Sequence, residues 1–189
     1  MKKSIFVFSI AVLLFSKISA QVTINGAILP AKLTQTKTEL ILNGAGVRTK
    51  YFIKVYVGGL YLTSKSKVAK DIIAADKPMA VRVHIISNLM TSTNMTTAII
   101  EGFEKSTAGN TKPIQPKIDR CTKIFKKEPI KVGDVFDIYY VPKEGIKIFK
   151  NGKLQDSAIP GMDLKKAIFG IWFCGDPVDE NLKKGMLGL

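Results

Sequence analysis

The hydrophobic pattern along the chain changes repeatedly between two periods. Apolar, β-branched and aromatic residues that recur at every second position are typical of strands, whereas apolar residues spaced three and four apart are typical of amphipathic helices. The strand-like stretches are residues 22–29, 38–42, 51–62, 79–86, 132–141, 145–149 and 153–159. The helix-like stretches are residues 66–75, 91–105, 116–127, 162–172 and 178–187.

The order of these stretches predicts the fold class. Strands come first, then a helix, a strand, two helices, a meander of strands and two final helices, without the strict strand-helix alternation of a doubly wound nucleotide-binding fold. Such an order favours an α+β domain with an antiparallel sheet and helices packed on one side of it. No internal repeat or low-complexity tract interrupts it.

Glycine pairs and Asn-Gly dipeptides mark the expected turns. Asn151-Gly152 is a strong signal for a two-residue hairpin, and Asn25-Gly26 is a turn signal within an expected entry strand or hairpin. Gly44 and Gly46 are expected to break the strand that begins near residue 38. Gly58-Gly59 lies inside a strand-like run, which indicates a bulge or a close approach of another part of the backbone.

The first 20 residues have the pattern of a signal peptide. Lys2 and Lys3 precede an apolar run over residues 5–15, and the small residues Ser19 and Ala20 precede the expected cleavage site. The run is shorter than the ~20 residues of a membrane-spanning helix. We therefore expect an exported protein, periplasmic or extracellular, whose single domain spans residues 21–189, a length that suits one hydrophobic core.

The chain is strongly basic, with a formal net charge of +14. Three of its lysines lie in the first 20 residues, so residues 21–189 carry +11. A basic surface raises nucleic acid as a partner, but export argues against it, and an anionic envelope surface or an acidic ligand fits better. Lysines also simply keep many proteins soluble.

Motifs for common chemistries are absent from the sequence. It has no phosphate-binding glycine loop, no Gly-x-Ser-x-Gly elbow and no His-Glu-x-x-His pair. One histidine and two cysteines do not suit a structural zinc site, so no metal and no cofactor are expected. Cys121 and Cys174 are far apart in sequence, and an exported protein permits but does not require a disulfide between them.

The stretch of residues 40–62 contains the strongest candidate binding pair. Arg48 follows two glycines, and a guanidinium that faces a cavity binds carboxylates with two parallel hydrogen bonds. The Tyr56 phenol can donate a further hydrogen bond to the same anion. On a straight strand the two residues would be ~26 Å apart, so the pair requires a turn near residues 48–50. The alternative is a surface arginine beside a turn and a core tyrosine.

Two segments resemble the chalcone isomerase-like family. The segment NGAGVRTKYFIKVYVGGLYL, residues 43–62, is similar to the family's N-terminal signature of Gly-x-Gly-x-Arg, Phe, Lys-Val-Tyr and Leu-Tyr-Leu. The segment IPGMDLKKAIFGIWFCGDPVDENLKKGMLG, residues 159–188, resembles the closing helices of its bacterial members. The resemblance implies an open-faced β-sandwich, in which a layer of helices and an antiparallel sheet enclose a cleft.

The family includes isomerases that close a chalcone to a flavanone, and members that bind fatty acids through an arginine and a tyrosine. Arg48 matches the shared arginine, and Tyr56 stands where the enzymes have threonine. Asn94 and Glu101 align with a tyrosine and an asparagine of the enzymes, and the later Ser/Thr contact falls near Gly161. The resemblance therefore implies a site of Arg48, Tyr56 and Asn94 for a fatty acid or similar apolar anion, without catalytic residues.

Two other functions remain open on this sequence. One is an intramolecular lyase of the chalcone isomerase type, and the other is a structural or interaction protein that contacts the envelope through its basic surface. A lipid site also needs an apolar cavity, although the residues expected to line it serve equally well as ordinary core. These residues are Phe52, Leu60, Met90, Met95, Ile99 and Phe103.

Overall fold

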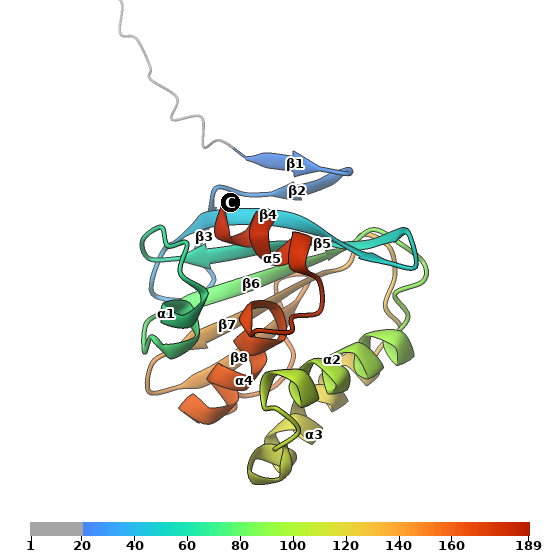
Figure 1. The fold of residues 1–189 in the computed structure, drawn as a ribbon. Helices are drawn as coiled ribbons and strands as arrows, with labels where there is room; N and C mark the ends of the chain where they lie inside the picture. The colour runs from blue at the N-terminus through green and yellow to red at the C-terminus, as the bar shows by residue number, and fades with distance from the viewer. Residues whose placement is uncertain (1–20) are drawn as a thin grey trace, which may run out of the picture.

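A curled antiparallel sheet organises the protein (Figure 1). The computed structural model describes residues 21–189, and the signal peptide expected over residues 1–20 lies outside the described residues. Seven strands pair in chain order, each antiparallel to its neighbour. They are β3 (Lys32–Leu33), β4 (Leu40–Lys50), β5 (Ile53–Leu62), β6 (Met79–Ile85), β7 (Val135–Val141), β8 (Gly145–Lys150) and β9 (Lys153–Leu154).

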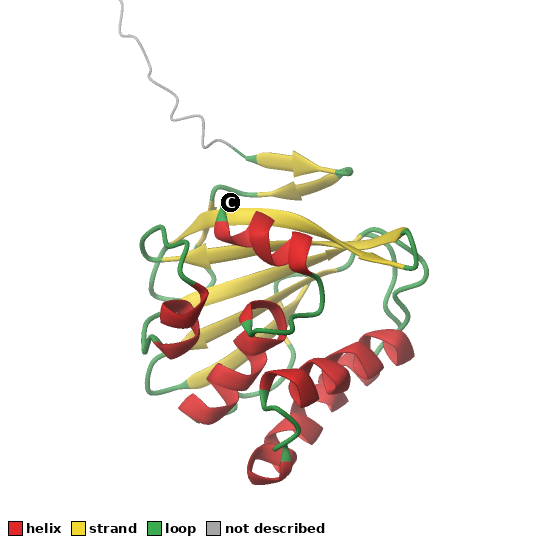
Figure 2. Cartoon of the chain, viewed as in Figure 1, coloured by secondary structure: helices red, strands yellow, loops and turns green. Residues whose placement is uncertain are grey.

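The helices cover one face of this sheet, as Figure 2 shows. They are α1 (Ala69–Ala74), α2 (Ser92–Ser106), α3 (Gln115–Lys126), α4 (Met162–Phe173) and α5 (Glu180–Leu187), with a short 3-10 turn, Lys112–Ile114, before α3. A separate hairpin of β1 (Val22–Ile24) and β2 (Ala27–Leu29) packs against Val57 on the opposite face. The predicted α+β class, with helices on one side of an antiparallel sheet, is confirmed.

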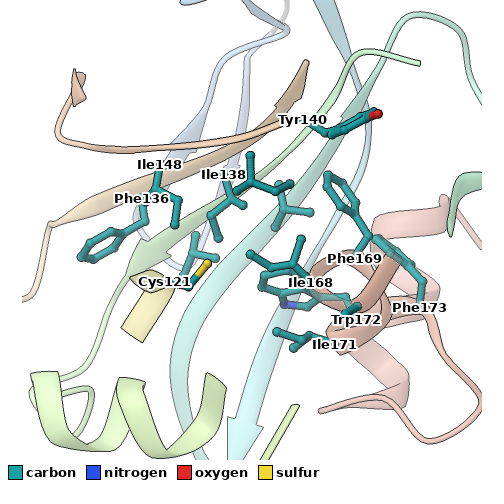
Figure 3. Packing of buried hydrophobic residues seen from close by; sticks show 14 of the residues in the cluster. Cys121, Phe136, Ile138, Tyr140, Ile148, Ile168, Phe169, Ile171, Trp172 and Phe173 are labelled. Carbon is teal, nitrogen blue, oxygen red and sulfur yellow. The ribbon is translucent and has the colours of Figure 1, made fainter. Parts of the chain in front are cut away.

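The main hydrophobic core lies between the sheet and the helices. In Figure 3 the α4 residues Ile168, Ile171 and Trp172 lie below Ile138 of β7, while Phe136 of the same strand lies to the left, near Cys121. Nine of the twelve α4 residues are buried, because this helix contacts the sheet on one side and α2 on the other. That position explains why α4 is apolar nearly all round rather than along one stripe.

A buried lysine connects α4 to α1. Lys165 is 0% exposed, and its ammonium donates hydrogen bonds to the carbonyl oxygens of Ile72, Ile73 and Ala75 at 2.7, 2.8 and 2.7 Å. These carbonyls lie at the C-terminal end of α1, where no backbone donor of the helix reaches them. Burial lowers the pKa of Lys165 to about 8, and the charge of Asp76 opposes this shift.

The expectation that Gly44 and Gly46 break the strand is wrong. Strand β4 runs through both, with a bulge at Asn43, because its glycines let α5 lie directly on the strand. A Cβ on Gly44 would overlap the carbonyl oxygen of Gly185, and one on Gly46 would lie 3.0 Å from that of Leu182. The glycines are therefore contact positions for a helix 140 residues later in the chain rather than strand ends.

Gly58-Gly59 also marks a close approach. The pairing of β5 with β6 is regular through both residues, so the bulge alternative is wrong there. A Cβ on Gly58 would lie 3.0 Å from Leu182 Cδ1 on the helical face, and one on Gly59 would overlap Leu29 Cδ2 on the other. The strand is thus enclosed by α5 on one face and by the N-terminal hairpin on the other.

The expected strand over residues 153–159 is mostly a loop. Only β9 and a single bridge between Ile146 and Ile159 are formed. The Arg120 side chain donates hydrogen bonds to the Asp156 carboxylate at 2.7 Å and to the Ser157 carbonyl at 2.9 Å. The Arg120 side chain of α3 thus binds polar groups of this segment that strand pairing would otherwise involve.

The two cysteines are free thiols. Cys121 is buried in α3, and burial raises its pKa to about 12, while Cys174 follows the end of α4 and is half-buried.

Within residues 21–189, every helix is too short or too polar to cross a bilayer. The same residues contain no group of three or more histidine, cysteine, aspartate or glutamate side chains placed to hold a metal ion.

Candidate functional site

The β4–β5 hairpin brings Arg48 and Tyr56 together. The two residues are direct cross-strand partners, so their side chains leave the sheet on the same face. The turn lies at residues 51–52, slightly later than the expected position near residues 48–50. The Arg48 Cζ atom is 5.5 Å from the centre of the Tyr56 ring, within the range of a cation–π contact.

The alternation of Gly44, Gly46 and Arg48 has a structural reason. Side chains two residues apart on a strand share a face, so all three positions face the helical layer. Helix α5 occupies the space above the two glycines and begins beside Thr49. The side chain of Arg48 is thus the first on this face of β4 that extends into the space beyond the helix.

The acidic side chain in this neighbourhood is already bound. Asp179 caps α5 by accepting a hydrogen bond from the Leu182 amide at 2.9 Å. Its other oxygen accepts a hydrogen bond from the Thr49 amide, also at 2.9 Å. This carboxylate fixes the start of α5 against β4 and forms no salt bridge with Arg48.

Arg48 is a buried cation without an anionic partner among residues 21–189. Arg48 is only 7% exposed, and its Nε atom has no hydrogen-bond partner within residues 21–189. Buried charges are normally paired, because removing an ion from water costs several kcal/mol. An arginine in this state is well suited to bind an anion that enters from outside.

The Tyr56 phenol is oriented by Trp172. The indole Nε1–H donates to the Tyr56 hydroxyl oxygen at 2.9 Å, and both residues are buried. Within residues 21–189, no hydrogen bond uses the Tyr56 hydroxyl as donor. Burial raises the pKa of Tyr56, and the charge of Arg48 opposes this shift. The phenol therefore keeps its proton at neutral pH, and its O–H can donate a hydrogen bond to an anion.

Trp172 is a site residue that the sequence reasoning did not find. The signal available was a lone tryptophan in an otherwise apolar helix, since a buried indole N–H usually finds an acceptor. Nothing in the sequence, however, identified that acceptor as Tyr56, because the two residues are 116 positions apart.

Two cavities open on Arg48. The inner one, between the sheet and the helices, has a volume of about 20 Å³, and its wall is almost entirely apolar. The outer one has a volume of about 230 Å³ and opens beside the turn of the β4–β5 hairpin. Arg48 and Ala98 belong to both walls, so the guanidinium lies between a solvent-accessible hollow and the apolar core. The outer cavity is lined by Arg48, Lys50, Tyr51, Val55, Leu89, Met90, Asn94 and Ala98.

Asn94 lies in the wall of the outer cavity, opposite the strand that carries Arg48. Its amide Nδ2 donates to the Leu89 carbonyl at 2.7 Å, and its backbone N–H donates to the Thr91 hydroxyl that caps α2. Asn94 therefore holds the loop before α2, and its Oδ1 atom makes no hydrogen bond among residues 21–189. Glu101, two turns further along α2, is exposed and lines neither cavity.

The expected cavity lining is half right. Met90 lines the outer cavity, and Met95 and Ile99 line the inner one. Leu60 and Phe103 are buried elsewhere in the core. The placement of Phe52 is wrong, because it lies at the hairpin turn and is fully exposed.

Comparison with known proteins agrees with this fold. A crystal structure of a fatty-acid binding protein from Arabidopsis thaliana superposes with a TM-score of 0.71 and 18% sequence identity, over 89% of this chain and 96% of that one. At this identity the likeness shows the fold alone. No curated protein matches the sequence. The sequence profile described as chalcone isomerase-like matches residues 21–188, and the chain therefore belongs to the chalcone isomerase-like family.

Proposed function

We propose that this protein binds a fatty acid or a similar apolar carboxylate, with Arg48 as the anchor for the carboxylate. The observation that carries the proposal is the buried Arg48 guanidinium at the junction of the outer and inner cavities, with no salt bridge within residues 21–189 and no hydrogen-bond partner for its Nε atom. A carboxylate there would supply the missing counter-charge. The Tyr56 hydroxyl would donate a second hydrogen bond, and Asn94 would lie at the mouth.

The size of the inner cavity sets a condition on binding. A volume of about 20 Å³ is close to that of a single water site. Ligand pockets usually measure ~300–1,000 Å³, so the outer cavity, at about 230 Å³, would hold the carboxylate at Arg48 but only a small part of a chain. Tyr56 lines the inner cavity alone, so contact between its hydroxyl and the carboxylate requires the inner cavity to widen. A long chain requires movement of Met95 and Ile99, and the unbranched, flexible methionine is suited to such repacking.

Binding has more support than isomerisation. The Arabidopsis protein of the same fold is a fatty-acid binding protein. An isomerase needs several fixed donors around the charge that develops in the transition state. Glu101 and Gly161 align with residues that contact the substrate in the enzymes, but they line neither cavity at Arg48 and would therefore supply no donor there.

The proposal is tested by titrating the purified protein with palmitate and with hexadecanol, which has the same chain without a carboxylate. Palmitate should bind at least tenfold more tightly, because only the acid uses the guanidinium. Arg48→Met keeps the apolar stem and should weaken palmitate by about 10- to 100-fold, the equivalent of ~1.5–3 kcal/mol for a charged hydrogen-bonded contact.

Arg120→Met is the matched control. It removes the same charge from α3, where Arg120 pairs with Asp156 away from the cavities, and should leave palmitate affinity unchanged. Equal binding of palmitate by the native protein and by Arg48→Met would overturn the proposed site. Conversion of a chalcone faster than in buffer would instead establish the lyase function.

A further inference from the structure

The turn between β4 and β5 is built from unusual residues. Tyr51 and Phe52 have φ angles of 49° and 65°, in the left-handed region that favours Gly, Asn and Asp. The same chain makes two other hairpin turns with similar angles, and both use Asn-Gly. Their φ angles are 47° and 79° at Asn25-Gly26, and 50° and 80° at Asn151-Gly152. Two bulky aromatic residues therefore stand where this chain otherwise places its best turn formers.

These aromatic side chains do not stabilise the fold by burial. Tyr51 is 84% exposed, Phe52 is 100% exposed and the following Ile53 is 44% exposed. Leu89, in the loop that leads into α2, is a further exposed apolar residue on the wall of the outer cavity. In Figure 1 the turn lies at the right-hand edge of the sheet, beside that loop. Strained backbone that displays apolar side chains to solvent points to a binding role.

The flanking charges indicate the kind of surface that the turn meets. Lys50 and Lys54 stand on either side of the aromatic pair, and residues 50–54, the hairpin tip, contain no acidic side chain. Neither lysine forms a salt bridge within residues 21–189. The Lys50 ammonium is 5.6 Å from the Tyr51 ring, and that of Lys54 donates to the Asn25 side chain.

We propose that the hairpin tip docks on an anionic lipid surface, with Phe52 and Tyr51 inserted at the interface and Lys50 and Lys54 against the head groups. Aromatic residues favour the boundary between head groups and acyl chains, and lysines near the surface gain from anionic lipids. A protruding tip whose two lysines form no salt bridge within residues 21–189 fits a fluid charged layer better than a flat protein interface.

Docking would bring the outer cavity to the same surface. Lys50 and Tyr51 of the tip, together with Leu89, form part of the cavity wall that contains Arg48. An apolar carboxylate could then pass between the lipid layer and the guanidinium without crossing open water. Docking itself does not depend on that ligand, because none of the tip side chains requires an occupied cavity.

The test is co-sedimentation of the purified protein with vesicles of phosphatidylcholine alone or mixed with phosphatidylglycerol. The native protein should bind the anionic vesicles and bind less as salt rises. Phe52→Ser should weaken binding at least tenfold, and Lys50→Ser with Lys54→Ser should abolish the preference for anionic vesicles. Val68→Ser is the matched control, since Val68 is 52% exposed beside α1, and it should change nothing.

A tryptophan probe reports insertion directly. With Phe52→Trp, brominated lipids should quench the new emission, whereas the buried Trp172 should be unaffected. Equal sedimentation of native protein and Phe52→Ser, or no binding to anionic vesicles, would overturn the proposal and leave a protein partner as the occupant of the tip. Arg48→Met should bind vesicles as the native protein does, so failure of the lipid surface and failure of the ligand site are distinguishable.

Discussion

Replacement of the unusual turn by the chain's own Asn-Gly solution should stabilise the protein. The change is Tyr51→Asn together with Phe52→Gly. Left-handed backbone costs a bulky L-residue ~1–2 kcal/mol, and asparagine and glycine largely avoid this cost. Glycine also has more conformational freedom in the unfolded chain, and this reduces the gain in stability by ~0.5–1 kcal/mol. Since both residues are in the left-handed region and both aromatic side chains are exposed, little burial is lost, and we expect a net gain of at least about 1 kcal/mol.

The gain should appear as a higher denaturation midpoint in urea with an unchanged slope. For a domain of this size, 1 kcal/mol corresponds to a rise in melting temperature of about 2–4 °C. The reverse change, Asn25→Tyr with Gly26→Phe, is the control. A Cβ on Gly26 meets nothing within 4 Å, so the loss expected there comes mainly from backbone conformation, with a smaller part from the exposed hydrogen bond that Lys54 donates to Asn25.

The two measurements together decide whether the strain is real. If the changes at residues 51 and 52 leave stability unaltered while those at residues 25 and 26 cost 1 kcal/mol or more, the argument from φ angles is refuted. If the stabilised variant also loses vesicle binding, the aromatic turn is maintained at the expense of stability. Such a trade-off is expected where function selects a locally unfavourable residue.

Two further predictions concern buried groups. Because the pKa of Lys165 is lowered to about 8, the unfolded chain binds a proton there that the folded protein lacks above that pH. This group should therefore raise the free energy of unfolding by about 1 kcal/mol between pH 8.5 and pH 9.5. In urea titrations Lys165→Met should lack this increase, whereas Lys166→Met, at an exposed neighbouring position, should retain it. Gly44→Ala should cost about 2–3 kcal/mol in the same assay, because its Cβ overlaps the backbone of α5, whereas Gly175→Ala, with open space around it, should be nearly neutral.

The sequence by itself determined the elements that depend on local or periodic signals. Helical spacing predicted α2, α3 and α4, each within a few residues of its observed bounds. The Asn-Gly pairs at residues 25–26 and 151–152 form the expected hairpins, because their left-handed angles are a property of the residues themselves. The α+β class follows from the order of these elements, since strands that follow one another in the chain usually pair, as β6 and β7 do across the segment that contains α2 and α3.

The pairing of Arg48 with Tyr56 was partly accessible from the sequence. Residue chemistry identified both members, but their separation depended on a hairpin whose turn residues, Tyr51 and Phe52, carry no turn signal. Sequence reasoning accordingly assigned both aromatics to the strand that follows. A tertiary or functional requirement outweighed local preference at this point, which is where local prediction fails.

Only the tertiary structure decided the state of the site. Contact with α5 makes Gly44 and Gly46 strand residues, and the indole of Trp172 orients the Tyr56 phenol. Within residues 21–189, the Asp179 carboxylate accepts hydrogen bonds from two backbone amides, and Arg48 forms no salt bridge. Apart from the helix cap between Asp179 and Leu182, each of these contacts joins residues more than 100 positions apart. The chemistry of a side chain is written in the sequence, but whether that side chain is buried, paired or free is set by the parts of the chain that fold against it.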